Sequence, residues 1–287
     1  MSNILVTGSK GQLGLELVSL ENYFQNYIFF FTDKSNLDIT NFNAVSTFVL
    51  ENNIAIIINC AAYTNVDKAE EERGLANEIN YLAVENLAKI ATKQQLKLIH
   101  ISTDYVFDGA SKIPYKESDK TNPQNSYGSS KLKGEQALLT INPNNSAIIR
   151  TSWLYSNFGK NFVKTILRIS KEKDTISVVS DQIGSPTNAH DLATIILKIV
   201  PFLKSKGVQT YHYANAGECS WFQFAEEIVK LAQHNATVLP ITSEAFKTPT
   251  KRPKFSLLNT EKIQETFQLT IPHWKDSLQY CIERLKK

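Results

Sequence analysis

Tyr127 and Lys131 are the side chains of this 287-residue sequence that are best suited to proton transfer. They stand four residues apart, so a helix would place both on one face, and only Tyr127 among the 11 tyrosines has a lysine at this spacing. A neighbouring ammonium favours the phenolate and lowers a phenol pKa from its usual value of about 10. The pair therefore predicts an acid–base group, although an exposed helical Tyr–Lys pair would have the same spacing.

Thr103 adds a hydroxyl group to this pair. The apolar run Leu96–Ser102 is typical of a buried strand, and Thr103 and Asp104 follow it directly. The carboxyl ends of the strands in a parallel sheet form its ligand-binding edge. Tyr127 comes 24 residues after Thr103, on the next connection. The sequence therefore predicts one site in which Thr103 polarises a carbonyl group and Tyr127, assisted by Lys131, protonates it.

Three glycines near the N-terminus form a second candidate site. Gly8, Gly11 and Gly14 follow the strand-like run Ile4–Thr7 and lead into a helix-like stretch. Glycines let the backbone turn tightly and approach a pyrophosphate, and the free N–H groups of a helix N-terminus add partial positive charge. The pattern predicts a dinucleotide-binding loop, whereas glycines at this spacing alone would also suit a simple turn.

Asp33 follows the next strand-like run, Tyr27–Phe31, and lies 19 residues after Gly14. An acid at about this distance from the loop commonly accepts hydrogen bonds from the adenosine ribose. Lys34 beside it would tolerate a 2′-phosphate. NADPH and NADH therefore both remain candidates, and a solvated loop carboxylate is the alternative role for Asp33.

Alternating strands and helices must position these residues. Short apolar runs suit strands buried on both faces of a parallel sheet, and amphipathic stretches between them suit helices. The expected strands are Ile4–Thr7, Tyr27–Phe31, Ile54–Cys60, Leu96–Ser102 and Ala147–Thr151, and the expected helices are Leu13–Leu20, Asn41–Asn52, Leu75–Lys93 and Ser129–Thr140. This alternation predicts the α/β class, with a Rossmann-type, doubly wound parallel sheet.

The last third of the chain departs from this alternation. Its expected elements are the helices Phe162–Lys171 and His190–Phe202, a helix from the capping box Ser220–Gln223 to about His234, and the strand-like runs Thr175–Ser180 and Val238–Ile241. We expect residues 151–287 to form mainly a smaller C-terminal α/β substrate lobe. Residues 1–150, joined by parts of 183–215, are expected to form the dinucleotide-binding domain.

Composition limits the class of protein. Lys and Arg exceed Asp and Glu by three and are scattered, so no nucleic-acid partner is expected. Cys60, Cys219 and Cys281 lie far apart, which suits reduced structural thiols. No apolar stretch approaches the roughly 20 residues of a membrane span, and no signal-peptide pattern opens the sequence. We therefore expect a cytoplasmic protein with no membrane association.

The glycine loop with Thr103, Tyr127 and Lys131 resembles the extended short-chain dehydrogenase/reductase superfamily. Longer segments are similar to the dTDP-4-dehydrorhamnose reductases: 58–70, 102–109, 150–155, 181–187, and 252–253 with 258–262. The similarity spans nearly the whole chain. It implies that NADPH or NADH reduces the C4 ketone of dTDP-4-dehydro-6-deoxy-L-mannose to dTDP-L-rhamnose, the last step of dTDP-rhamnose synthesis.

The resemblance also implies a role for each matching residue. The motifs place Gly11, Gln12 and Leu13 on the pyrophosphate, Asp33, Asp38 and Ile39 on the adenosine side, and Ala62, Tyr63 and Thr64 beside the cofactor. Thr103, Asp104 and Trp153 would face the sugar, with Tyr127 as the acid and Lys131 as its partner. Arg252 is expected on the dTDP phosphates because a guanidinium matches phosphate oxygens. The alternative for Arg252 is a solvated loop arginine, and the alternative for Trp153 is an aromatic residue of the core.

Members of the family are often described as holding magnesium through glutamates at a dimer contact. Glu16 could match one of these glutamates, but the position expected for another is His190. This departure leads us to expect no metal ion in catalysis, and it leaves monomer and homodimer open.

Other functions fit parts of the pattern. Another nucleotide-sugar 4-ketoreductase, or an epimerase that recycles its NAD, would use the same Tyr–Lys pair. A 4,6-dehydratase would resemble Thr-Asp-Glu where this chain has Thr103, Asp104 and Tyr105, so the glutamate is missing. A non-catalytic regulatory subunit would keep the nucleotide fold, but the intact Thr103, Tyr127 and Lys131 argue against it.

Overall fold

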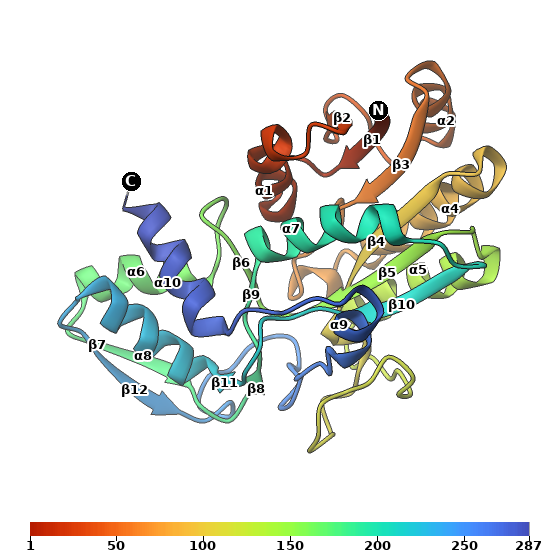
Figure 1. The fold of residues 1–287 in the computed structure, drawn as a ribbon. Coiled ribbons are helices and arrows are strands. Elements are labelled where there is room, and N and C mark those ends of the chain that lie inside the picture. The colour runs from red at the N-terminus through yellow and green to blue at the C-terminus, as the bar shows by residue number, and fades with distance from the viewer. Residues whose placement is uncertain (287) are drawn as a thin grey trace.

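A six-stranded sheet forms the centre of the computed structural model, which describes residues 1–286 (Figure 1). The strand order is β10-β5-β4-β3-β1-β2, and every neighbouring pair is parallel. The strands are β1 (Ser2–Thr7), β2 (Tyr27–Thr32), β3 (Ile54–Asn59), β4 (Lys97–Thr103), β5 (Ser146–Thr151) and β10 (Val208–His212). The predicted doubly wound α/β class is confirmed, and five of the six strands are those expected from the sequence.

The sequence pattern does not indicate β10. This strand lies at the edge of the sheet, where β5 is its neighbour. An edge strand is covered less completely than a central one, and Gln209 and Thr210 of β10 are partly exposed. The continuous apolar run that marks the central strands is therefore missing.

The order of the sheet reverses between β1 and β3. The chain places β2 on one side of β1 and β3 on the other. Doubly wound sheets bind ligands at such a switch point, in the crevice beyond the carboxyl ends of the strands. The glycine loop after β1 and the segment after β3 meet at this place.

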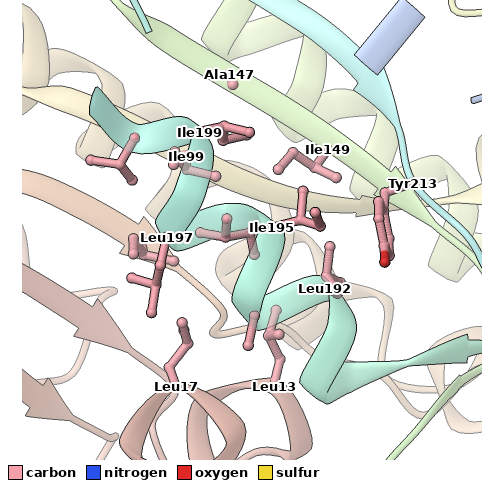
Figure 2. Packing of buried hydrophobic residues seen from close by; sticks show 14 of the residues in the cluster. Leu13, Leu17, Ile99, Ala147, Ile149, Leu192, Ile195, Leu197, Ile199 and Tyr213 are labelled. Atoms are coloured by element: carbon pink, nitrogen blue, oxygen red, sulfur yellow. The ribbon is translucent and has the colours of Figure 1, made fainter. Parts of the chain in front are cut away.

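Two layers of helices cover the sheet. On one face lie α1 (Gln12–Leu20) and α7 (Ala189–Ile199), whose buried side chains pack toward β4 and β5. Figure 2 shows Leu13 and Leu17 of α1 facing α7, with Ile99 and Ile149 of the sheet behind it. On the other face lie α2 (Phe42–Glu51), α4 (Ala83–Gln94) and α5 (Ser126–Ile141). Apolar burial on both faces is what holds a parallel sheet of this kind together.

The helix expected over Leu75–Lys93 contains an irregular turn. It begins as α3 (Arg73–Asn77), continues as a π-helical turn (Glu78–Leu82) and runs into α4. Such π turns are frequent at functional sites. This one buries Asn80, whose side chain joins the segment after β3 to α5, as described below.

The smaller C-terminal lobe lies beside the sheet, at the lower left of Figure 1. In it β7 (Thr175–Val179) pairs in parallel with β12 (Thr237–Ile241). The helices α6 (Phe162–Glu172), α8 (Trp221–Ala232) and α10 (Trp274–Leu285) share one apolar core with these strands. The capping box expected at the start of α8 is present, with both hydrogen bonds between Ser220 and Gln223 formed.

Short elements connect the two parts. The pairs are β6 (Leu154–Tyr155) with β9 (Thr187–Asn188) and β8 (Ile183–Gly184) with β11 (Cys219–Ser220). Helix α9 (Glu261–Phe267) returns to the large sheet, where Phe267 packs against Tyr211 of β10. Within residues 1–286, no helix has the length and apolar character needed to cross a membrane.

Candidate active site

A cavity of about 810 Å³ runs along the carboxyl ends of the strands. Most residues that the sequence assigns to a cofactor or substrate line it: Gly8, Gly11, Gln12, Leu13, Gly14, Asp33, Asp38, Ile39, Ala62, Thr64, Thr103, Asp104, Tyr127, Lys131 and Trp153. Tyr63 and Arg252 are not among the lining residues. The sheet therefore gathers side chains from five separate connections around one space.

Gly8 lies where the chain passes very close to the end of β3. Its φ of +68° is in the left-handed region, and a Cβ here would lie 2.6 Å from the Ala61 nitrogen. A Cβ on Gly14 would lie 2.5 Å from the Gly8 carbonyl oxygen. Only glycine fits at either place. The result is a narrow backbone cradle at the N-terminus of α1, which fits a pyrophosphate.

Asp33 forms an ion pair with Lys10 of the glycine loop. Its Oδ2 lies 2.5 Å from Nζ of Lys10, and its Oδ1 accepts a hydrogen bond from the Ser35 N–H at 2.6 Å. The Lys10 contact, followed by those from Ser35, lowers the pKa of Asp33 to about 2. The carboxylate is therefore ionised at neutral pH and is paired with a cation of the glycine loop.

Tyr127 and Lys131 share one helix. Helix α5 begins at Ser126, three residues earlier than expected from the sequence. The Glu70 carboxylate accepts hydrogen bonds from the Ser126 N–H and hydroxyl, each at 2.7 Å, and the Asn125 side chain caps the same turn. Side-chain acceptors at a helix N-terminus satisfy free N–H groups and complement the helix dipole. The turn that carries Tyr127 is therefore firmly held.

Burial raises the pKa of Tyr127 to about 12, and a hydrogen bond with Thr103 offsets this only in part. The expectation that Lys131 lowers this pKa is wrong for the protein alone, because the phenol is desolvated and the ammonium is engaged elsewhere. A phenol with this pKa is protonated at neutral pH, which is the form that a general acid needs. The ring of Tyr105 packs edge-on against Tyr127, with centroids 5.5 Å apart.

Lys131 is almost fully buried, with 2% of its surface exposed. Its Nζ donates a hydrogen bond to the Ile101 carbonyl at 2.6 Å and lies 3.3 Å from Nε2 of His100. Burial lowers the pKa of Lys131 to about 8, although the Glu135 carboxylate raises it in part. The ammonium therefore depends on these few partners for its charge.

Thr103 and Asp104 lie together where β4 ends. The Thr103 hydroxyl donates to Oδ1 of Asp104 at 3.1 Å. Oδ2 of Asp104 is buried without a hydrogen-bond partner in the described chain. Burial raises the pKa of Asp104 to about 6, and the hydroxyls of Ser256 and Thr103 lower it only partly. An unsatisfied carboxylate oxygen in a cavity suits a ligand hydroxyl group.

Trp153 separates this cavity from a second one. Its φ of +47° is rare for a large side chain, and its ring stacks on that of Trp221. Gly184 lies against the same ring, because a Cβ there would be 2.9 Å from it. Trp153 lines the first cavity and Trp221 the second, so the pair forms a shared wall. Trp221 was not predicted from the sequence, where its one signal is its place directly after the capping residue Ser220.

The second cavity, of about 870 Å³, lies in the lobe and includes Arg252. Lys247, Lys251 and Lys254 also line it, so the loop before α9 gives it a basic side. The guanidinium of Arg252 lies 3.5 Å from the Asp67 carboxylate, and its Nε has no hydrogen-bond partner among residues 1–286. Arg252 therefore lies where this loop meets the segment that follows β3.

Tyr63 does not line the first cavity, and its hydroxyl donates a hydrogen bond to the Glu72 carboxylate at 2.7 Å. Its backbone is held by Asn80, which accepts from the Tyr63 N–H at 2.9 Å and donates to the Tyr63 carbonyl at 3.0 Å. Asn80 also donates to the Ser130 hydroxyl at 3.0 Å. Asn80 was not predicted from the sequence, since nothing local indicates the π turn that buries it.

Glu16 is fully buried on α1 and is surrounded by hydrogen-bond donors. It accepts from the Ser156 hydroxyl at 2.7 Å and from Arg284 at 3.0 Å, and Nδ1 of His190 lies 3.2 Å away. Burial opposes its ionisation, but these partners together lower its pKa. Among residues 1–286, no group of three or more His, Cys, Asp and Glu side chains is placed to hold a metal ion. Metal-independent catalysis stays a prediction.

Comparison with known proteins shows what this chain is similar to. The family model described as "RmlD substrate binding domain" matches residues 1–287. The dTDP-4-dehydrorhamnose reductase of Aggregatibacter actinomycetemcomitans is 39% identical over 288 residues, which cover 97% of this chain and 98% of that protein. The chain belongs to the dTDP-4-dehydrorhamnose reductase family. The resemblance noted from its motifs is therefore confirmed, and the chain is an oxidoreductase.

Two further relatives bear on the cofactor and the sugar. The crystal structure of a family reductase from Bacillus anthracis, in complex with NADP, has a TM-score of 0.94 and 42% identity, covering 99% of this chain and 100% of that one. A dTDP-4-keto-6-deoxy-D-glucose reductase from Streptomyces niveus is 35% identical over 275 residues, covering 96% and 94% of the two chains. Similarity to the reductase family thus extends to a protein named for a second 4-keto sugar.

Proposed function

We propose that this protein uses NADPH or NADH to reduce the C4 ketone of dTDP-4-dehydro-6-deoxy-L-mannose, which yields dTDP-L-rhamnose as the last step of dTDP-rhamnose synthesis. The observation that carries the proposal is that Thr103, Tyr127 and Lys131 line the same cavity as the glycine loop. Membership of the reductase family names the substrate class. The proposed cofactor-binding part is residues 1–150 with parts of 183–215, and residues 151–287 would mainly bind the sugar nucleotide.

The cradle of Gly8, Gly11 and Gly14 would hold the pyrophosphate of the dinucleotide. Asp33 would face the adenosine ribose, and Lys10 beside it would donate a hydrogen bond to a 2′-phosphate. The other proposed contacts are Gln12, Leu13, Asp38, Ile39, Ala62 and Thr64, with the backbone of Tyr63 held behind them by Asn80. When bound, the reduced nicotinamide supplies a hydride ion to the carbonyl carbon.

Tyr127 acts as the general acid. Its phenol is protonated at neutral pH, so the proton stays on its oxygen until negative charge develops on the substrate oxygen and then passes across. The Thr103 hydroxyl, which lines the same cavity as Tyr127, would orient the same substrate oxygen. The ammonium of Lys131 provides positive charge near the phenolate that remains.

The substrate would reach from the first cavity to the second, past the stacked pair Trp153 and Trp221. Trp153 would lie against the sugar, and Asp104 would accept a hydrogen bond from one of its hydroxyls. The basic side of the second cavity suits a diphosphate, and Arg252 is the proposed contact. The unpaired Nε of Arg252 supports this role over a purely structural one.

A reductase for another dTDP-linked 4-keto sugar is the second candidate, because a relative named for such a substrate is 35% identical. Thr103, Tyr127 and Lys131 would serve either reaction, and the configuration at C4 distinguishes the products. An epimerase would recycle its nicotinamide, and Tyr105 stands where a dehydratase would have glutamate.

One assay tests the proposal. The purified protein is supplied with dTDP-4-dehydro-rhamnose and NADPH or NADH, the loss of reduced nicotinamide is followed by absorbance, and the sugar is identified by NMR. Stoichiometric oxidation with formation of dTDP-L-rhamnose supports the proposal. Formation of the 6-deoxy-talose epimer would favour the second candidate, and conversion without net oxidation would favour an epimerase. We also propose that the protein works in the cytoplasm, without a metal ion, as a monomer or homodimer.

A further inference from the structure

A row of buried polar side chains crosses the sheet beneath α5 and ends at Lys131. The strand register pairs Thr7 of β1 with Asn59 of β3, and Asn59 with His100 of β4. Side chains of a strand alternate between its two faces. The three residues therefore share the face on which Leu5, Ile57 and Leu98 pack against α2, α4 and α5.

Short contacts join this row from end to end. The Thr7 hydroxyl donates to Oδ1 of Asn59 at 2.6 Å, and Nδ2 of Asn59 lies 3.0 Å from Nδ1 of His100. Nε2 of His100 then lies 3.3 Å from Nζ of Lys131. Thr7 and His100 have no exposed surface, and Asn59 has 1%. Polar groups are costly to bury unless they are hydrogen-bonded. The hydrogen bonds within this row therefore depend on one another.

The row can satisfy either charge state of the lysine. A neutral imidazole has one N–H donor and one acceptor nitrogen, and an amide can present its oxygen or its nitrogen to either neighbour. When Thr7 donates to Oδ1 of Asn59, the Asn59 amide nitrogen donates to Nδ1 of His100. The proton of the imidazole is then on Nε2, which donates to an uncharged Lys131 amine. When the Asn59 amide is turned over, each of these hydrogen bonds reverses. The Lys131 ammonium then donates to Nε2 of His100, and Nδ1–H donates to the Asn59 amide oxygen.

Burial and the nearby Lys131 charge together hold the pKa of His100 far below its usual range. The ring is therefore neutral, and one of its nitrogens is always an acceptor. The ammonium of Lys131 has three N–H donors, of which one goes to the Ile101 carbonyl. If His100 accepts the second, the third is left for the cavity that Lys131 lines.

We infer that His100 is a positioning residue for Lys131: with the Asn59 amide turned over from the orientation given above, Nε2 accepts a hydrogen bond from the ammonium and, with the Ile101 carbonyl, directs the remaining N–H into the cavity. The inference rests on the role proposed above for Lys131. It gives a role in the site to a histidine that is fully buried within β4. His100 does not touch the substrate, and it acts through the lysine.

The charge of Lys131 also depends on this contact. The other titratable groups near the lysine are Glu135 and Tyr127 on α5 and Cys60 after β3. Loss of an acceptor destabilises the ammonium and lowers its pKa further. Removal of the His100 ring should therefore move the alkaline limb of activity to lower pH.

The test compares His100→Leu with His100→Gln, because a glutamine Oε1 can occupy the place of Nε2 as an acceptor. We expect His100→Leu to reduce kcat/KM roughly 10²-fold, the effect of a small misplacement at a reacting centre. Its alkaline limb should move to lower pH, while the KM for the sugar stays unchanged. His100→Gln should recover most of the rate and the original pH profile.

His212→Leu is the matched control. His212 is also fully buried in the sheet and lies beside a cation, Arg150, but it does not line the cavity. Its substitution should lower the thermal midpoint without moving the pH profile. Equal losses in His100→Leu and His100→Gln, or an unchanged rate and pH profile in His100→Leu, would overturn the inference.

Two measurements separate the inference from the proposed function. If Lys131→Ala leaves cofactor binding and turnover intact, the role proposed for Lys131 fails; if it abolishes them while His100→Leu leaves the rate and the pH profile unchanged, only the inference fails. Nitrogen NMR of the unmodified protein reports directly on the ring, even if the leucine variant does not fold. Below the lysine pKa of about 8 we expect His100 to carry its proton on Nδ1. A proton on Nε2 there would overturn the inference.

Discussion

The indole rings of Trp153 and Trp221 stack face to face, with centroids 3.7 Å apart and planes inclined by 12°. Trp153 follows β5, whereas Trp221 opens α8 in the lobe, so the stack joins the two parts of the molecule. On the far side, Phe162 of α6 packs against Trp221 with centroids 4.6 Å apart. The orientation of Trp153 therefore depends on a residue that belongs to the second cavity.

Trp221→Ala should weaken sugar binding through Trp153. A stacked aromatic pair contributes about 0.5–1.5 kcal/mol, so we expect a roughly two- to tenfold rise in KM for the dTDP-sugar. Trp221→Phe should retain part of the effect, and near-UV circular dichroism should report the loss of the stack. The KM for NADPH serves as the internal control. An unchanged sugar KM in the alanine variant would show that Trp153 holds its position unaided.

Tyr127→Phe should remove the general acid and leave the cofactor site intact. Loss of general acid catalysis commonly reduces the rate by roughly 10²–10⁴-fold, and we expect kcat to fall in this range. Fluorescence titration with NADPH should give the dissociation constant of the unmodified protein. Tyr280→Phe, at a position that is 42% exposed, is the control for loss of a phenol hydroxyl. Normal turnover by the Tyr127 variant would exclude this residue from the mechanism.

Asp33→Ala should change the preference between the two cofactors. Loss of the carboxylate removes an acceptor for the ribose hydroxyls and frees Lys10 for a 2′-phosphate. We expect the KM for NADH to rise roughly tenfold, with a smaller change for NADPH. Lys10→Ala should raise the KM for NADPH more than the KM for NADH. Steady-state kinetics with both cofactors decide the point, and equal changes for NADH and NADPH would contradict the assignment.

Asp104→Asn should have opposite effects on stability and on activity. The pKa of this carboxyl is about 6 in the fold, against 3.8 for an ordinary aspartate, so the folded protein binds more protons between these values. The carboxyl therefore weakens the fold as the pH rises through this window. We expect the variant to unfold at a higher urea concentration than the unmodified protein at neutral pH.

The difference should vanish below the ordinary pKa of 3.8, where both states hold the proton. A difference that persisted there would point to packing rather than charge. At neutral pH the variant should nevertheless be less active, because an amide is a weaker acceptor for the sugar hydroxyl than a carboxylate. Urea denaturation and kcat/KM for the sugar, each measured against pH, provide the two readouts.

Removal of divalent metal ions should leave activity unchanged. The Glu16 carboxylate is already neutralised by Arg284, with Ser156 and His190 as further partners. The measurement is turnover before and after treatment with EDTA, with Mg²⁺ added back as the control. A large loss that Mg²⁺ restores would contradict the prediction.

Features that depend on local spacing could be predicted from the sequence by itself. The glycine loop between β1 and α1, the place of Asp33 after β2 and the four-residue step from Tyr127 to Lys131 are all set within a short stretch of chain. The central strands were also predictable, because burial on both faces demands continuous apolar runs. The family resemblance followed from the same local motifs.

Only the tertiary structure decided which distant groups meet and how far they are desolvated. Burial raises the pKa of Tyr127, where spacing alone suggested that Lys131 would lower it. The contact of His100 with Lys131 depends on the packing of α5 over β4, and the stack of Trp153 on Trp221 depends on the docking of the lobe. Contacts and desolvation are properties of the assembled surroundings, so no local pattern of residues encodes them.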